Sequence, residues 1–377
     1  MSIEPANAAC FRFDAKLRIL DSERKGKDEA VRNRDGFFGA VSRRVFIGTA
    51  ASAAGMYTLP LTFSNSLPQG SRAATRTKPD SKFNGVQIGV ITYSFRDLEP
   101  GIEGVLKACV ESGCSSIELM SSGIEEWCGA PNLPARVRGP AGGTASRGWQ
   151  LPTLEQRSAQ DKYNADLKAW RSAAPMNKFV ELRKIFNDAG IKIHIVKWAP
   201  ARWSDEDIDY AFKTAKALGA NCITDELTLD AAKRLGPIAE NHGMIVALHT
   251  HMQFATPGFE EDVLKPAFAV SRAVKLNFDV GHFAGSTGRH PNEIMDRYGD
   301  RIFSLHLKDK SGPKTTPPNQ NQVWGQGETP LEDVLLKVRH EKLPYFCDIE
   351  LEYSIAAWST SAKEVRTCLK YARQILI

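Results

Sequence analysis

Short apolar segments alternate with amphipathic segments along the chain from residue 83 to its end. The apolar segments have the length of buried strands, whereas the segments between them repeat their apolar residues with a helical period. This alternation is typical of βα units built around a parallel sheet. We predict eight strands, near residues 88–95, 115–120, 191–196, 221–225, 244–249, 274–280, 302–307 and 345–351. Eight such units favour a single (β/α)8 TIM barrel, of the α/β class, over residues 83–377.

Helix signals between the predicted strands support this assignment. Ser204 precedes an acidic helix start, and Gly219 follows the last apolar residue of that helix. The next helix is expected to begin near residue 229 and to stop near Gly243, and the last to span about residues 361–376.

Two predicted connections are longer than ordinary barrel loops. One follows strand 2, from residue 121 to about 161, and the other follows strand 7, from residue 310 to 329. Both leave the carboxyl end of a strand, where the active sites of such barrels lie. We expect them to form walls or lids over a substrate.

The first 82 residues have a different character and are predicted to be an unfolded leader. Their Ser42-Arg43-Arg44-Val45-Phe46 resembles the core of a twin-arginine export signal, and a weakly apolar run too short for a stable membrane span follows it. The sequence therefore predicts export to the periplasm by the twin-arginine machinery, with 51–53 as one possible cleavage site. The alternative is a chance arginine pair before a buried helix.

Charge and cysteine content exclude several classes of protein. The net charge is +5, but residues 1–82 hold 14 Lys or Arg against 8 Asp or Glu, and the remainder holds 35 against 36. A neutral barrel has no electrostatic footprint for nucleic acid. The seven cysteines include no C-x-x-C pair, which argues against a thiolate zinc site and a disulfide framework.

Polar side chains gather at the carboxyl ends of the predicted strands. Side chains alternate between the two faces of a strand, and this alternation points the following inward: Glu118, His194, His249, Asp279, His306, Lys308, Glu350 and Glu352. Ionisable groups inside a barrel are costly unless they are paired or bind a cation. Two imidazoles and two carboxylates suit one divalent metal ion, Mn²⁺, Co²⁺, Fe²⁺, Zn²⁺ or Mg²⁺. We predict that His249, Asp279, His306 and Glu350 hold it.

Each of these residues also has a structural interpretation. His194 is as easily a hydrogen-bonded core residue as a substrate contact. Glu118 can form an ion pair across the barrel or touch substrate. His251 and Glu352 share a face with His249 and Glu350, so a shift of two residues would exchange either pair.

From about residue 87 to the end, the chain resembles the sugar phosphate isomerase/epimerase superfamily of xylose isomerase-like TIM barrels. The resemblance rests on a D-x-x-H motif at Asp279-Val280-Gly281-His282 and on three further segments, 305–309, 324–330 and 349–353. It implies the same four metal ligands and gives His282 contact with substrate hydroxyls. It also implies a small-molecule carbohydrate as substrate, and homo-oligomers are conceivable.

One ligand departs from the family pattern. Epimerases of the family carry a carboxylate at the end of strand 5, where this chain has His249. We predict an isomerase or epimerase-type enzyme that acts on a ketose or keto-sugar through a metal-stabilised enediolate. The departure makes a lyase, hydratase or hydrolase acting on a 3-keto-glycoside or inosose-like substrate the alternative.

The predicted catalytic groups are Glu350, Glu118 and Lys308, with Glu352 as another possible base. Lys308 would steady developing negative charge, and His282, His194, His251, Trp324 and Glu352 would bind substrate. For Trp324 and the other loop tryptophans, ordinary packing between helix and barrel is the alternative.

Two other functions remain open at this point. One is an exported carbohydrate-binding barrel without catalysis, which the complete ligand set argues against. The other is a nuclease of the endonuclease IV type, which the neutral barrel and the export signal disfavour.

Overall fold

The computed structural model describes residues 78–98, 101–121, 123–132 and 153–377. Most of the predicted leader, including its twin-arginine motif and its cleavage site, lies outside these residues, and so does part of the long loop after strand 2. The leader and its boundary at residue 82 therefore stay predictions. Among the described helices, none combines the length and the apolar character that crossing a membrane requires.

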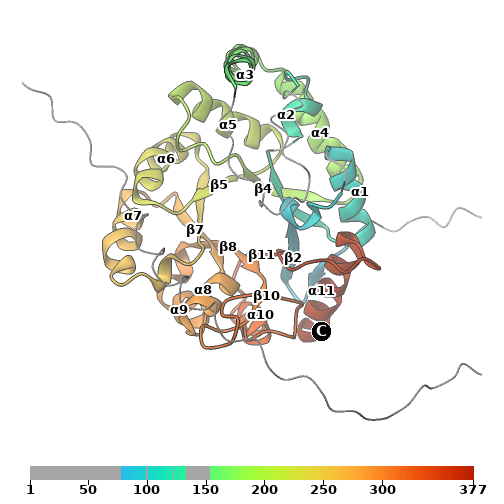
Figure 1. Ribbon diagram of the computed structural model, residues 1–377, viewed down its shortest axis with the longest axis vertical. Helices are drawn as coiled ribbons and strands as arrows, with labels where there is room; N and C mark the ends of the chain where they lie inside the picture. Colours follow the sequence, from blue (N-terminus) through green and yellow to red (C-terminus); the bar gives the residue numbers. More distant parts are fainter. Residues whose placement is uncertain (1–77, 99–100, 122, 133–152) are drawn as a thin grey trace, which may run out of the picture. The chain divides into compact units, whose positions relative to one another are not determined.

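Eight parallel strands form a closed barrel, which confirms the predicted fold (Figure 1). Each strand pairs with the next along the chain, and β2 closes the ring by pairing with both β3 and β11. The barrel strands are β2 (Val86–Ile91), β3 (Ser116–Met120), β4 (Lys192–Lys197), β5 (Cys222–Glu226), β6 (Ile245–His249), β7 (Val274–Asp279), β8 (Ile302–Leu307) and β11 (Phe346–Ile349).

Helices surround the strands (Figure 1), and all of them except α3 contribute buried residues. They are α1 (Ile102–Ser112), α2 (Ile124–Trp127), α3 (Leu154–Ser172), α4 (Met176–Asp188), α5 (Asp205–Ala217), α6 (Leu229–His242), α7 (Lys265–Val270), α8 (Val280–Thr287), α9 (Asn292–Tyr298), α10 (Leu331–His340) and α11 (Ser361–Leu376). The predicted helix signals are confirmed, because Ser204 caps α5 and Gly243 ends α6 in a left-handed conformation.

The first strand is shorter than predicted. It ends at Ile91, and residues Thr92–Phe95 form a short 3-10 helix, η1. The hydroxyl of Ser94 donates to the carbonyl of Ile349 and accepts the amide of Leu351, at 3.0 Å each. These bonds to the chain after β11 hold η1 against the neighbouring strand end, a tertiary effect that the local pattern does not reveal.

Both long connections contain structure of their own. The first holds α2 and α3, and the second holds the two-stranded hairpin of β9 (Asp309–Lys310) and β10 (Asn321–Gln322). One carboxylate ties the second loop down, because Asp309 accepts the amides of Gly325 at 2.8 Å, Gly327 at 2.9 Å and Thr329 at 3.2 Å. A short antiparallel strand, β1 (Lys82–Phe83), precedes the barrel and pairs with β2.

The interior of the barrel is polar in the layers below the carboxyl ends of the strands. Buried polar side chains bond across it between strands that are not neighbours, as Glu118 of β3 does with Asn277 of β7. The group consists of Ser116, Glu118, His194, Thr224, Asn277, Ser304 and Asp348. Barrel interiors are usually filled by branched apolar side chains, so the number of buried polar side chains here is unusual.

Candidate metal centre

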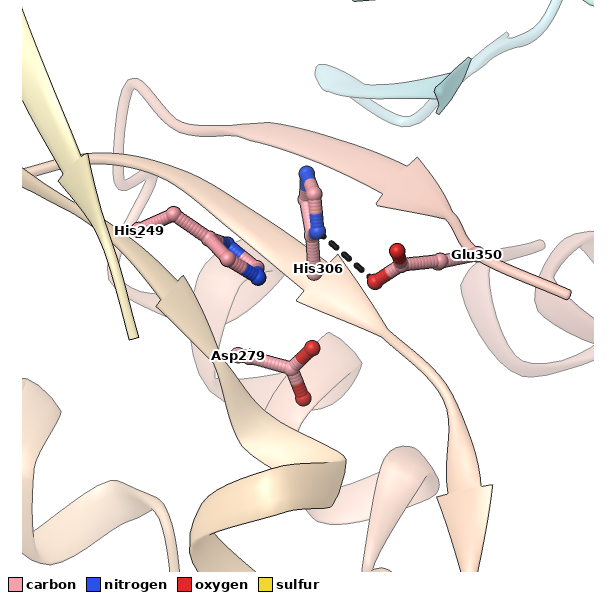
Figure 2. Close-up of side chains that lie close together, drawn as sticks. All are labelled: His249, Asp279, His306 and Glu350. Atoms are coloured by element: carbon pink, nitrogen blue, oxygen red, sulfur yellow. Dashed lines mark hydrogen bonds and ion pairs between the residues drawn. The ribbon is translucent and has the colours of Figure 1, made fainter. Parts of the chain in front are cut away.

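Four side chains from four consecutive strands meet at the carboxyl end of the barrel (Figure 2). His249 is the last residue of β6 and Asp279 the last of β7, while His306 lies in β8 and Glu350 directly follows β11. One nitrogen or oxygen from each lies within 4.8 Å of the others, and all four residues are buried. The structure thus brings together the four residues that were predicted as ligands.

Asp279 reaches the centre because the chain turns from strand to helix at this residue. Its Oδ1 accepts the amide of His282 at 2.7 Å and caps α8, which holds the carboxylate in one orientation. Gly281 lets Lys308 pass close to this turn, since a Cβ there would lie 2.2 Å from Lys308 Cγ. The D-V-G-H segment therefore combines a helix cap, a close approach and a candidate ligand.

His306 is held at both ring nitrogens. Its Nδ1 lies 2.9 Å from Glu350 Oε2, and its Nε2 lies 2.8 Å from Glu118 Oε2. Burial favours the neutral ring, but the two carboxylates outweigh it and raise the pKa of His306 well above its usual value. The imidazole is thus fixed in place by acids above and below it.

Lys308 neutralises the carboxylates of the centre. Its buried ammonium lies 3.0 Å from Asp279, 2.9 Å from Glu350 and 2.8 Å from Glu352. Burial lowers the pKa of a lysine, but these carboxylates outweigh it and raise the pKa of Lys308 above its ordinary value. In turn, burial opposes ionisation of Glu350, yet Lys308 and His306 hold its pKa well below the usual range.

His249 is the least restrained of the four. Its Nδ1 is buried and makes no hydrogen bond to the described residues. Burial, with a contribution from His306, lowers the pKa of His249 well below its usual value, so the ring is neutral and has lone-pair density to offer. Two imidazole nitrogens and two carboxylate oxygens from four directions fit a divalent ion of the predicted series.

A second group of ionisable residues lines the rim above the centre. The His282 ring lies 4.9 Å from the His251 ring between centroids, and its Nε2 lies 3.7 Å from Glu352 Oε2. Burial and the charge of Lys308 lower the pKa of His282 to about 3. His251 and Glu352 are partly exposed, so the structure places these three predicted substrate contacts together at the open end.

Two residues of this rim were not predicted from the sequence. Glu226 ends β5 and lies 3.1 Å from His251 Nδ1 and 3.1 Å from Lys197. The signal that could have revealed Glu226 is its position at the end of a strand, on the same face as the inward-pointing Thr224. Lys197 ends β4. Counting alternate residues from His194 predicts that Lys197 points outward, but a register shift between β3 and β4 reverses the alternation and brings Lys197 to the rim.

The other predicted site residues lie away from the rim. Glu118 is fully buried beneath His306, and His194 is hydrogen-bonded on both nitrogens farther down the barrel. Trp324 is buried with its ring edge-on to Tyr371 of α11, at 5.9 Å between centroids. For His194 and Trp324 these surroundings favour the structural alternative.

Comparison with known proteins identifies the family of this barrel. A family model described as the xylose isomerase-like TIM barrel matches residues 164–372, more than half of the chain. The inosose dehydratase of Clostridium beijerinckii is 29% identical over 175 residues, which cover 46% of this chain and 50% of that protein. An inosose dehydratase of Clostridium botulinum is 35% identical over 83 residues, 22% of this chain and 28% of that protein. The chain thus aligns with half or less of the length of these relatives.

One solved structure shows the same fold. A sugar phosphate isomerase/epimerase from Parabacteroides distasonis superposes with a TM-score of 0.50 at 16% identity, covering 78% of this chain and 96% of that chain. By the family model, this chain belongs to the xylose isomerase-like TIM barrel family.

Proposed function

We propose that this protein is a divalent-metal-dependent carbohydrate enzyme that removes a proton from the carbon next to a carbonyl and then eliminates water. The substrate class is a keto-sugar or a cyclic keto-polyol such as an inosose. The observation that carries the proposal is the meeting of two imidazoles, two carboxylates and a buried lysine at the open end of the barrel. Similarity to two proteins named inosose dehydratase supports the elimination step.

His249, Asp279, His306 and Glu350 would hold the ion. When bound, it would supply Lewis acidity that polarises the substrate carbonyl. Lys308 would stabilise negative charge that develops on the substrate oxygen. Neutral His282 would hydrogen-bond a substrate hydroxyl.

The residue best placed as the base is Glu352. Its side chain is 22% exposed, compared with 7% for Glu350 and none for Glu118. Glu350 Oε2 contacts both His306 and Lys308, whereas Glu352 contacts Lys308 and borders the open rim. Glu352 would accept the proton from carbon, and the electrons of that C–H bond would form a carbon–carbon double bond. Glu352 would then give the same proton to the β-hydroxyl, which would leave as water.

Isomerisation or epimerisation is the second candidate, and one observation favours it. Glu226 ends β5, which lies opposite β11 in the eight-stranded ring, so its carboxylate stands across the rim from Glu352. Epimerisation needs two proton-transferring groups on opposite faces of one carbon. Glu226 would supply the acid that is missing from the end of β6, where this chain has His249.

A single assay in deuterated water separates these outcomes. The protein is loaded with Mn²⁺ or Zn²⁺ and mixed with inososes, 3-keto-glycosides and ketoses, and the products are followed by ultraviolet absorbance and NMR. Elimination gives a conjugated product, whereas epimerisation gives deuterium at the carbon without loss of water. The proposal is wrong if the protein binds no divalent ion, or if it binds sugars without turnover or exchange, as a binding barrel would.

A further inference from the structure

Glu118 occupies a position that the proposed reaction does not use. It lies in β3, is completely buried, and sits beneath His306 rather than at the rim where substrate would enter. We propose that Glu118 is a positioning residue, which turns the His306 ring so that Nδ1 faces the metal centre. This inference rests on the metal site of the proposed function.

Three side chains fix the Glu118 carboxylate. Its Oε2 lies 2.8 Å from His306 Nε2 and accepts the side-chain amide of Asn277 at 2.8 Å. Its Oε1 accepts a longer bond, 3.4 Å, from the hydroxyl of Thr224. The acceptor below His306 is therefore held from neighbouring parts of the barrel and cannot swing away.

The acceptor determines which nitrogen of His306 carries the proton. An ionised carboxylate only accepts hydrogen bonds, so the bond requires a proton on Nε2. Asn277 Nδ2 lies 3.2 Å from Nε2, but this amide already donates to Glu118 Oε2 at the shorter distance of 2.8 Å. Nδ1 is then the nitrogen that faces the centre, on the side of Glu350.

His249, the other imidazole of the centre, has no carboxylate partner comparable to Glu118 among the described residues. Its Nδ1 has no hydrogen bond to the described residues, so nothing there selects between its two neutral forms. Of the two imidazoles in the centre, only His306 is backed by a carboxylate. A partner of this kind orients a ligand and raises its basicity, and its loss commonly weakens metal binding about 10–100-fold.

The test compares Glu118→Gln with Asp348→Asn. Both changes keep the shape of the side chain and remove one buried carboxylate bonded to an imidazole nitrogen, and Asp348 is 2.8 Å from His194 rather than His306. Full-length proteins are titrated with Zn²⁺ by calorimetry, and the folded state of each is checked by circular dichroism. Glu118→Gln is expected to weaken Zn²⁺ binding about 10–100-fold, and Asp348→Asn to leave it within about threefold.

A second measurement uses the unaltered protein. With ¹⁵N-labelled histidine and bound Zn²⁺, NMR should show the metal on Nδ1 of His306 and a slowly exchanging proton on Nε2. This measurement decides the matter even if Glu118→Gln does not fold.

Three results distinguish the two proposals. Zn²⁺ on Nε2 of His306, or equal affinity in the wild type and Glu118→Gln, overturns the role of Glu118 alone. Absence of Zn²⁺ binding by the wild type overturns the metal site and the role of Glu118 together. Weakened binding in Glu118→Gln, with no turnover of any substrate by the wild type, upholds the positioning role and refutes the proposed reaction.

Discussion

Two buried histidines of the barrel each have partners at both ring nitrogens but lie in different surroundings. His306 lies between Glu118 at 2.8 Å and Glu350 at 2.9 Å, and His194 lies between Ser116 and Asp348, both at 2.8 Å. Neither side chain is exposed. An imidazole held by a carboxylate is thus not in itself a functional site.

The difference lies in what surrounds each ring. The His194 ring stacks on Phe346, with 4.1 Å between centroids and 12° between planes, so it is sealed in the barrel. The His306 ring lies 4.6 Å from the ring of His249, at the layer where the strands end. Asp348 and Glu350 are two residues apart in sequence, so about 7 Å along the strand separates the layer of His194 from the candidate centre.

The largest predicted effect comes from replacing each of the two histidines with alanine. His306→Ala and His194→Ala should each lower the free energy of unfolding by about 3–5 kcal/mol, because each leaves a buried carboxylate without its partner. Only His306→Ala should abolish Zn²⁺ binding. Zn²⁺ at 100 times its Kd should add about 2.7 kcal/mol to the stability of wild type and His194→Ala, and nothing to His306→Ala.

Denaturant unfolding with and without Zn²⁺ checks this prediction. Equal Zn²⁺ stabilisation of all three proteins would show that His306 is not a ligand. Loss of Zn²⁺ stabilisation in His194→Ala would show that the lower layer is not merely structural.

Much of the fold could be predicted because it depends on local periodicity. The eight strands were located from alternating apolar runs, and the cap at Ser204 and the stop at Gly243 from residues with defined backbone roles. The end of β2 was wrong because η1 is held by bonds to the chain after β11. Such bonds join residues far apart in sequence and leave no trace in the local pattern.

The residues of the candidate centre could also be predicted, but their hydrogen-bond partners could not. The ends of parallel strands meet at one end of a barrel, so a polar residue at each end was enough to bring the four candidate ligands together. Which nitrogen of His306 meets which carboxylate could not be read, because Glu118 lies 188 positions away in sequence. The register shift near His194 likewise hid Lys197, since one extra residue exchanges the two faces of a strand.

Two glycines allow the two layers to be disturbed separately. Gly281 makes room for Lys308 in the candidate centre, and Gly89 makes room for Asp348 in the layer of His194. A Cβ on Gly281 would lie 2.2 Å from Lys308 Cγ, and a Cβ on Gly89 would lie 2.1 Å from Asp348 Oδ1. Either change to alanine should lower the free energy of unfolding by about 1–3 kcal/mol through overpacking. Gly281→Ala should in addition reduce turnover by displacing Lys308, while Gly89→Ala should leave Zn²⁺ affinity unchanged.

Thermal unfolding and kinetics on the same preparations measure both effects. If Gly89→Ala and Gly281→Ala reduced turnover equally at equal stability, the layer of His194 would affect the reaction as much as the candidate centre does.

The smallest predicted effect comes from Ser116→Ala in the lower layer. His194 Nε2 lies 2.8 Å from Asp348 Oδ2, and His194 Nδ1 lies 2.8 Å from the hydroxyl of Ser116. Removing that hydroxyl should cost about 1 kcal/mol in the free energy of unfolding, since one side-chain hydrogen bond of the buried ring is lost. Zn²⁺ affinity, measured by calorimetry, should stay at the wild-type value. A weaker affinity would mean that the lower layer acts on the upper one through Asp348, which has a carboxylate oxygen within 4.8 Å of ligand atoms of both Glu118 and His306. The division between a structural pair and a functional pair would then be one of degree.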